Sequence, residues 1–251
     1  MNKFLLALQF LTSIPVKVRN FQQKDLAQSI IYFPVVGLVL GLGLAGIFYL
    51  LSFLNLESWV TNTVLIIILT ILTGGLHLDG LADNADALFS RKNKTEMLEI
   101  MRDSRIGTMG VLALISVILL KIALLSSLSA SSVAPALICA CVLSRWSMAL
   151  LMFKFPYARQ EGKAKFFIQG MNLRIFILAT LIALCCLILI LKLKGVLLIL
   201  IAGICAYAMG KFTDRKINGI TGDTIGATNE LIEVTVLFAL CILERANLWI
   251  I

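Results

Sequence analysis

The stretch WVTNTVLIIILTILTGGLHLDGLADNADALFS, residues 59–90, joins an apolar run to three aspartates and the only histidine of the chain. Its first part, Trp59 to Leu76, has the length and character of a membrane-spanning helix, which needs about 20 mainly apolar residues. The second part places Asp79, Asp83 and Asp86 directly behind that helix. The chain has only 14 acidic residues. The grouping of three of them at a membrane boundary therefore indicates a functional site as well as a membrane-spanning helix.

The composition of the whole chain predicts a polytopic membrane protein. Hydrophobic residues make up 60% and charged residues 14%, with a mean hydropathy of +0.98, whereas roughly a quarter of the residues of a soluble domain are charged. We therefore expect an all-α integral membrane bundle with short loops, forming a single domain over residues 1–251. The predicted spans, about seven in number, are Ile30–Leu54, Trp59–Leu76, Thr108–Leu128, Val133–Phe153, Ile175–Leu191, Gly195–Lys211 and Leu231–Trp249.

The net charge of +8 is explained by the positions of the basic residues and does not indicate a nucleic-acid partner. Lysine and arginine concentrate before the first predicted span and in alternate connections after it, at residues 91–105, 154–174 and 211–216. The other connections are nearly free of them, apart from Lys192 and Lys194. This alternation is the positive-inside pattern, which predicts that residues 77–107, 154–174 and 211–229 face the cytoplasm.

Two further segments call for a prediction about packing. The run FLLALQFLTSIPV, residues 4–16, is too short for a span, so we expect an interfacial or re-entrant segment. The run GLGLAG, Gly41 to Gly46, matches a dinucleotide-binding motif but lies inside an apolar span with no preceding strand. Together with Gly37 it predicts close helix–helix packing instead.

The aspartate cluster has the spacing i, i+4, i+7, which places all three carboxylates on one face of a helix. Like charges so close repel, and magnesium suits such a cluster because it prefers hard oxygen ligands and often bridges carboxylates to substrate phosphates. A solvated helix face is the alternative. His77, at the membrane boundary, is either a ligand contact or an interfacial residue.

The segment NKTEMLEIMRDSRIGTMG, residues 93–110, follows. Asn93 and Glu96 resemble a capping box, and an apolar stripe of Met97, Ile100 and Met101 predicts a short amphipathic helix at the membrane surface. That helix would deliver Arg102, Asp103 and Arg105 toward the aspartates. Two arginines beside an acid suit phosphate recognition, although ordinary positive-inside charges are the alternative.

A third segment, NGITGDTIGATNELIE, residues 218–233, has the same features. Small polar residues from Thr221 to Gly226 allow backbone N–H groups to approach a phosphate. Glu230 and Glu233 then enter the last predicted span, where ionisable residues usually face a polar cavity or the bundle interior. Three separate segments thus bring acids and small residues toward one membrane interface.

The motifs GGLHLDGLAD, MRDSRIGT and TGDTIGA, at residues 74, 101 and 221 onward, resemble the hallmark segments of the cobalamin synthase, or adenosylcobinamide-GDP ribazoletransferase, family. The similarity extends almost end to end and includes FPVVGLVLG at residue 33, Ser144-Arg145 and the YAR tripeptide that ends at Arg159. The chain departs from the family pattern at Ala87, where glycine is expected, and in NGITGD, where GGQTGD is more usual.

The resemblance implies a magnesium-dependent enzyme of the last assembly step of vitamin B12. In that reaction a hydroxyl of α-ribazole, or of its 5′-phosphate, attacks the cobinamide-side phosphorus of adenosylcobinamide-GDP, and GMP leaves. The expected metal ligands are Asp79, Asp83, Asp86, Asp103 and Asp223, with Asp86 either a ligand or the base. The expected catalytic residues are Asp86, Arg102, Arg105 and His77, and the expected substrate-binding residues are Arg102, Arg105, Thr221, Gly222, Thr224, Glu230 and Glu233.

The expected setting is a bacterial inner membrane, with the lipid bilayer as partner and the active site facing the cytoplasm. The sequence leaves open whether the chain forms a homo-oligomer. One alternative is a CDP-alcohol phosphotransferase-like phospholipid enzyme, whose Ala-Arg signature and wider aspartate spacing are not matched. Another is a cation-coupled transporter, which would favour acids near the bilayer midplane and internal repeats, whereas here the acids gather at one interface.

Overall fold

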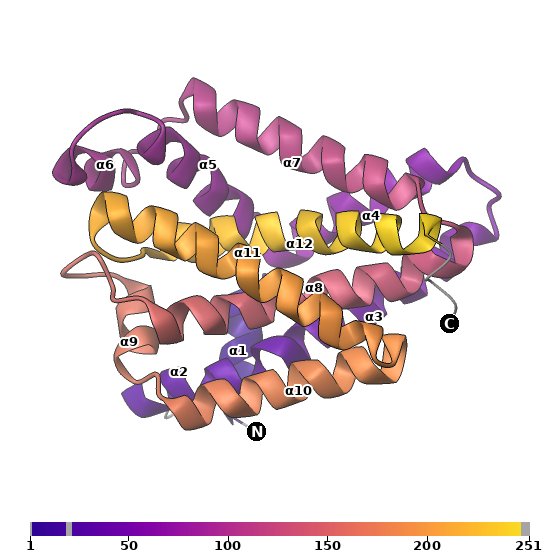
Figure 1. Cartoon of the computed structure of the whole chain (residues 1–251), viewed down its shortest axis with the longest axis horizontal. Helices are drawn as coiled ribbons and strands as arrows, with labels where there is room; N and C mark the ends of the chain where they lie inside the picture. The colour runs from indigo at the N-terminus through magenta and orange to yellow at the C-terminus, as the bar shows by residue number, and fades with distance from the viewer. Residues whose placement is uncertain (1, 19–21, 247–251) are drawn as a thin grey trace.

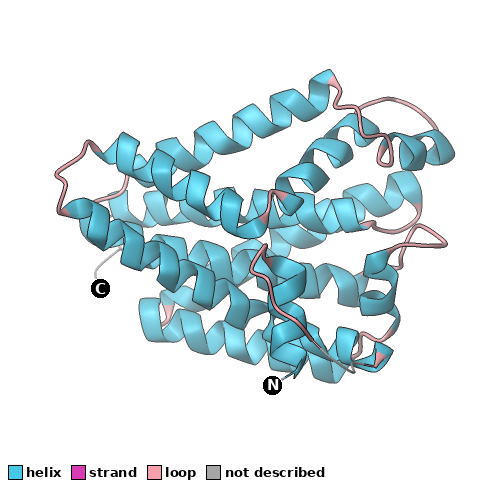
Figure 2. Ribbon diagram, turned by 180° about the vertical axis from the view of Figure 1, so that it is seen from behind, coloured by secondary structure: helices cyan, strands magenta, loops and turns pink. Residues whose placement is uncertain are grey.

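The computed structural model describes residues 2–18 and 22–246, and within these ranges the chain is helical, with one isolated β-bridge (Figures 1 and 2). The elements are α1 Asn2–Leu11, α2 Gln23–Ser29, the 3₁₀ turn η1 Ile30–Tyr32, α3 Phe33–Ser52, α4 Ser58–Thr73, α5 Leu76–Leu88, α6 Lys94–Ile100, α7 Thr108–Ser126, α8 Ala130–Lys154, α9 Lys163–Gln169, α10 Leu173–Leu191, α11 Lys194–Ile217 and α12 Gly222–Arg245. The predicted all-α membrane bundle is confirmed.

Six helical segments of the described ranges are long and apolar enough to cross a membrane, or seven if the bent pair α4–α5 is one span. Most predicted spans agree with a helix to within a few residues. The last one does not, because α12 begins at Gly222, nine positions before the predicted start at Leu231. The predicted end at Trp249 lies outside the described residues.

The chain turns through 90° between α4 and α5. Gly74 and Gly75 both have positive φ, at 63° and 69°, a conformation that glycine adopts without a steric penalty. Ser13, just after α1, bonds from its N–H to the carbonyl of Leu72 (2.8 Å) and from its hydroxyl to that of Ile71 (2.8 Å). The N-terminal segment therefore satisfies carbonyl groups at the end of α4 and supports the bend that directs α5 across the bundle.

The helix α1 packs into the bundle: Leu6, Ala7 and Leu11 are buried. Phe10 contacts two further rings, those of Phe33 at 5.9 Å and Phe167 at 4.4 Å between centroids. One face of α1 is therefore part of the folded core.

Two glycines set the approach of α3 to α8. A Cβ atom at Gly37 would lie 2.3 Å from the carbonyl oxygen of Cys141, and one at Gly41 would lie 2.6 Å from Cα of Ile138. The predicted helix-packing role is confirmed for these two positions. Gly43 and Gly46, from the same motif, face open space and take no part in the crossing.

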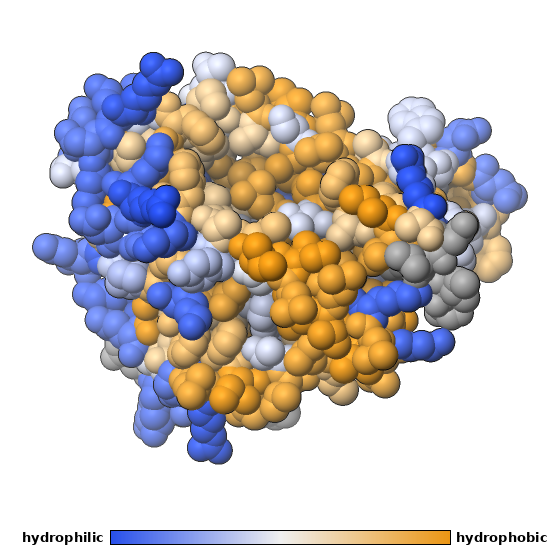
Figure 3. All heavy atoms as spheres, viewed as in Figure 1, coloured by the Kyte–Doolittle hydropathy of each residue, from blue (hydrophilic) through white to orange (hydrophobic). Residues whose placement is uncertain are grey.

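Hydrophilic residues gather at one end of the bundle. In Figure 3 they cover the left end of the view, where α6, α9 and the α11–α12 connection lie in Figure 1, with a smaller group at the opposite end and an apolar surface between. The three segments singled out in the sequence therefore meet at the same end. The capping box of α6 is confirmed, but Met97 and Met101 pack against Ala87, Leu88 and Ile217 of the protein.

Candidate active site

The site is built on the crossing of α5 and α12. A Cβ atom at Gly80 would lie 3.0 Å from the carbonyl oxygen of Asp223, and one at Gly226 would lie 3.3 Å from Cα of His77. The side-chain amide of Asn84 donates a hydrogen bond to Oγ1 of Thr224 (3.1 Å). This close packing brings the aspartates of α5 next to the first turn of α12, although the two segments are 140 residues apart in the chain.

The first turn of α12 is fixed by its own cap and by a neighbouring loop. Oγ1 of Thr221 accepts a hydrogen bond from the N–H of Thr224 (3.2 Å). Tyr157 and Ile220 form the isolated parallel bridge, with bonds of 2.9 Å from Ala158 N–H to Ile220 and from Ile220 N–H to Pro156. This bridge holds the loop after α8 against the start of α12.

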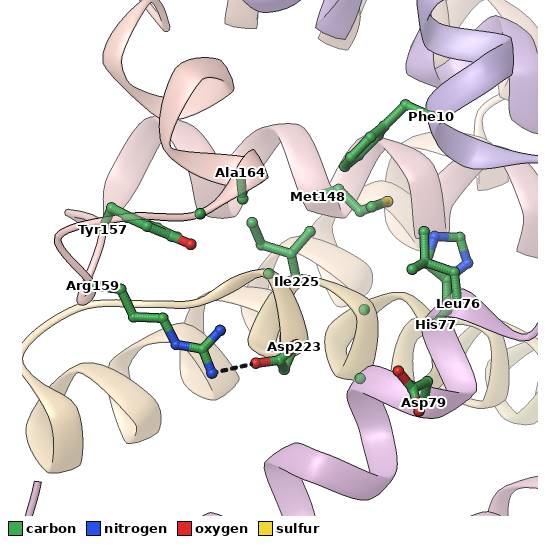
Figure 4. A pocket seen from close by; sticks show the side chains of 14 residues that line it. Phe10, Leu76, His77, Asp79, Met148, Tyr157, Arg159, Ala164, Asp223 and Ile225 are labelled. Carbon is green, nitrogen blue, oxygen red and sulfur yellow. Dashed lines mark hydrogen bonds and ion pairs between the residues drawn. The ribbon is translucent and has the colours of Figure 1, made fainter. Parts of the chain in front are cut away.

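That loop carries Arg159, whose Nη2 lies 2.8 Å from a carboxylate oxygen of Asp223 (Figure 4). Oγ1 of Thr221 donates to the same oxygen at 3.3 Å. Asp223 thus has a cation and a hydroxyl to orient it, which favours a single position of its carboxylate.

Two cavities border Asp79, and the first is a polar groove of about 650 Å³ between α5 and the α6–α7 connection. Four charged side chains line it: Asp79, Asp83, Arg102 and Asp103. The Gly74–Gly75 bend and several apolar residues complete the lining. The predicted convergence of the α5 aspartates with the arginine segment is confirmed for these four. Arg105 does not line the groove; it pairs with Asp103 at 2.6 Å, and this bond holds the pKa of Asp103 at about 2.

The second cavity, the apolar pocket, measures about 230 Å³ and lies on the other side of Asp79 (Figure 4). Phe10, Leu76, Met148 and Ile225 form its apolar walls, together with His77. Its polar side carries Asp79, Asp223, Arg159 and Tyr157. Leu76 and Asp79 line both cavities, so the two spaces share a wall.

The negative charge of the aspartates that line the two cavities is only partly balanced by ion pairs. Asp103 and Asp223 each have an arginine partner. The carboxylates of Asp79 and Asp83, one helical turn apart, have no ion-pair or hydrogen-bond partner among residues 2–18 and 22–246. Two unpaired carboxylates in one groove favour the binding of a cation.

The structure places Asp86 away from both cavities. Its two carboxylate oxygens accept hydrogen bonds from the N–H groups of Gly107 (2.6 Å) and Gly110 (2.8 Å), at the start of α7. Negative charge is stabilising at a helix N-terminus. Asp86 therefore holds α7 against α5, and its oxygens are engaged in that contact.

Glu230 and Glu233 also lie outside both cavities. Lys121 of α7 bonds to Glu230 at 2.6 Å and to Glu233 at 2.5 Å, and Arg145 of α8 pairs with Glu233. All four side chains are almost fully buried. This group, the buried charge cluster, is neutral overall and connects three helices.

Gly222 lines the apolar pocket, whereas Thr221 and Thr224 are fully buried beneath it. Several lining residues of the apolar pocket were absent from the predicted site, among them Phe10, Met148, Tyr157 and Arg159. Arg159 carried a signal, since it belongs to the YAR tripeptide, but nothing in the sequence pairs it with Asp223. Phe10 and Met148 come from α1 and α8 and look like core residues.

Magnesium fits this donor set when the ion is shared with a substrate. In the described part of the chain no three acidic, histidine or cysteine side chains come close enough to hold a metal by themselves. Magnesium is commonly held by one or two carboxylates plus phosphate oxygens and water. The unpaired carboxylates of Asp79 and Asp83 supply that number.

Replacing Gly80 by alanine is expected to reduce activity strongly, because the new Cβ would lie 3.0–3.1 Å from backbone atoms of Asp223 and force α5 and α12 apart. Overpacking of this kind costs about 1–3 kcal/mol. Turnover and thermal stability in detergent are the measurements. Gly43→Ala is the matched control because Gly43 faces open space; equal behaviour of the two variants would contradict the role of the crossing.

Fold and site together define a polytopic helical membrane protein with an acidic site at one end of its bundle. A family model described as cobalamin-5-phosphate synthase matches residues 3–241. The chain belongs to this family. It is 39% identical to the adenosylcobinamide-GDP ribazoletransferase of Desulforamulus reducens, over 97% of both chains.

A second relative, the adenosylcobinamide-GDP ribazoletransferase of Escherichia coli K12, is also 39% identical, over 94% of this chain and 98% of its own length. No solved structure matches the chain. The family assignment expected from the three motifs is confirmed.

Proposed function

We propose that the chain is an adenosylcobinamide-GDP ribazoletransferase. It joins adenosylcobinamide-GDP and α-ribazole, or α-ribazole 5′-phosphate, into adenosylcobalamin or its 5′-phosphate and releases GMP. The observation that carries the proposal is the shared wall at Asp79: a charged groove and an apolar pocket meet at one carboxylate. Two substrates that react with each other need such a meeting point.

In the proposed step, a ribose hydroxyl oxygen forms a bond to the cobinamide-side phosphorus. The bond from that phosphorus to the bridging oxygen breaks, and GMP leaves with the electron pair. Arg102 contacts the diphosphate in the groove, since guanidinium groups recognise phosphate well. Asp223, oriented by Arg159, accepts the hydroxyl proton; Asp86 is not assigned this role because its oxygens bond to α7.

Asp79 and Asp83 would hold magnesium, which neutralises charge on phosphoryl oxygens when bound. Wild-type protein with both substrates is therefore expected to release GMP with magnesium and to lose this activity after chelation, with recovery on adding the ion back. GMP and adenosylcobalamin formation are the measurements. Absence of both products from folded protein with magnesium would refute the enzyme assignment, and full activity after chelation would refute the metal.

We further propose that the site faces the cytoplasm, on the basis of the positive-inside pattern. A cysteine replacing Lys92 or Glu161, both exposed at the site end, should not react with an impermeant thiol reagent in intact cells of a cysteine-free background. A cysteine replacing Leu193, 83% exposed between α10 and α11, should react. The reverse pattern would invert the topology.

A further inference from the structure

A further cavity lies on the outer surface of the bundle, between α8, α10 and α11. This space, the outer groove, measures about 630 Å³ and shares no lining residue with the polar groove or the apolar pocket. Figure 1 shows α10 and α11 diverging from their short connection toward the site end of the bundle, with α8 visible between them. The outer groove therefore belongs to the membrane-facing surface and not to the active site.

The polar groups inside the outer groove are already bonded. Nε1 of Trp146 donates a hydrogen bond to Oγ1 of Thr180 (3.0 Å), and that hydroxyl donates to the carbonyl of Phe176 (2.8 Å). The remaining lining side chains are apolar, apart from the phenol of Tyr207. A polar ligand would leave its own donors and acceptors unpaired here, so the groove favours a hydrocarbon chain.

The length of the outer groove matches one leaflet of a bilayer. Its lining residues run from Phe176 to Leu184 on α10 and from Val196 to Ala208 on α11, which is about 12 Å and about 18 Å along the helix axes. The hydrocarbon core is about 30 Å thick, so one leaflet contributes about 15 Å. An acyl chain that enters at the site end can therefore lie along the groove.

An unpaired cation lies at the site end of the outer groove. Lys154 ends α8, one turn after Leu150 of the groove lining, and its Nζ lies 5.1 Å from the ring centroid of Phe153. That ring stacks on the lining residue Phe176, with 4.7 Å between centroids. The side chain of Lys154 is exposed and has no ion-pair partner in the part of the chain that the structure describes.

Two more cations come from α11. Lys211 and Arg215 continue the i, i+4 row of the lining residues Gly203 and Tyr207, so they lie on the same face of the helix beyond the groove. Asp214 balances one of them, since it pairs with Lys211 at 3.4 Å. With Lys154 included, three cations and one carboxylate leave two positive charges at this end.

This combination of charge and apolar length distinguishes a lipid from a second copy of the chain. Copies in one membrane have the same orientation, so the basic ends of two facing grooves would repel each other. An anionic phospholipid supplies the opposite charge together with an acyl chain. Basic pockets between membrane helices are known to bind anionic lipid head groups.

We propose that the outer groove binds one anionic phospholipid of the surrounding membrane, with an acyl chain against α8, α10 and α11 and the phosphate between Lys154 and Lys211. The phenol of Tyr207 lies at the same end, because its ring contacts that of Phe155 just after α8 (5.5 Å between centroids). Tyrosine is enriched at this level of a membrane. The lipid site is separate from the proposed reaction, so failure of one leaves the other standing.

The charge contact is tested by native mass spectrometry of the full chain in detergent, with phosphatidylglycerol or phosphatidylcholine of identical acyl chains added. Wild-type protein should bind the first phosphatidylglycerol several-fold more tightly than phosphatidylcholine. Each basic residue is worth roughly a fivefold change in affinity, so Lys154→Gln/Lys211→Gln should weaken phosphatidylglycerol binding on the order of tenfold and leave phosphatidylcholine binding unchanged. Lys192→Gln, exposed at the other end of α10, is the control and should behave as wild type.

The groove itself is tested by filling it. Ala208→Phe should weaken the binding of both lipids several-fold, whereas Cys205→Phe, also exposed on α11 but outside the lining, should not. The exposed positions of both residues make loss of the fold an unlikely cause, and an unchanged unfolding midpoint checks this. Equal affinity for the two lipids, or a preference that survives Lys154→Gln/Lys211→Gln, would overturn the lipid site. A dimer that Ala208→Phe dissociates and Cys205→Phe does not would assign the groove to a second copy and refute the proposal.

Discussion

Asp79→Asn and Asp223→Asn are each expected to lower GMP release on the order of 10²–10³-fold, as the loss of one electrostatic contact to a transition state does. The double variant should lose little more than the worse single variant. Residues that act on one transition state are not additive, and the structure brings both side chains to the same pocket from α5 and α12. The measurement is single-turnover GMP release with the amount of folded protein normalised.

Asp214→Asn provides the matched control. Asp214 lies on α11, pairs with Lys211 at 3.4 Å and lines neither cavity, so the same chemical change should leave turnover near wild type. Independent sites would instead give losses that multiply. Multiplied losses in the Asp79/Asp223 double variant would separate the two residues and contradict a composite active site.

The second large effect is expected from the buried charge cluster. Lys121→Met leaves Glu230 without its cation and Glu233 with only Arg145. Removing one member of a buried ion pair costs about 3–5 kcal/mol, because a buried charge remains uncompensated. Lys121→Met should therefore lower the thermal unfolding midpoint in detergent by roughly 10 °C.

The double variant Lys121→Met/Glu230→Leu should be more stable than Lys121→Met alone. It removes one charge of each sign and leaves the Arg145–Glu233 pair in place, so the cluster remains neutral. Met and Leu also suit an apolar interior. If the double variant were less stable than the single one, the cluster would owe its stability to something other than charge balance.

The spans could be predicted closely because apolar length alone determines them. The predicted span Thr108–Leu128 corresponds to α7 at Thr108–Ser126. The start of α12 could not be found in this way, since residues 222–230 include too many polar side chains to extend an apolar span and lie before its predicted start at Leu231. They are helical because Thr221 caps the helix and because their side chains pack against α5.

The candidate site shows the same division. The spacing of Asp79, Asp83 and Asp86 correctly indicates one helix face, and two of the three line the polar groove. Asp86 lies about 10 Å further along the helix axis than Asp79, where it meets the start of α7. Residue spacing within one helix does not predict where a neighbouring helix packs. For the same reason it does not predict the pairing of Arg159 with Asp223, or of Lys121 with Glu230 and Glu233.

The crossing of α5 and α12 also determines when the protein becomes complete during its synthesis. The acidic face of α5 leaves the ribosome early, and its partner helix follows about 140 residues later. Until α12 enters the membrane, Gly80 has no helix to pack against and Asp79 has no Asp223 beside it. A nascent chain therefore exposes the α5 side of the site before the α12 side exists. A chain that stops before α12 carries the α5 carboxylates but lacks the α12 residues that line the apolar pocket with them.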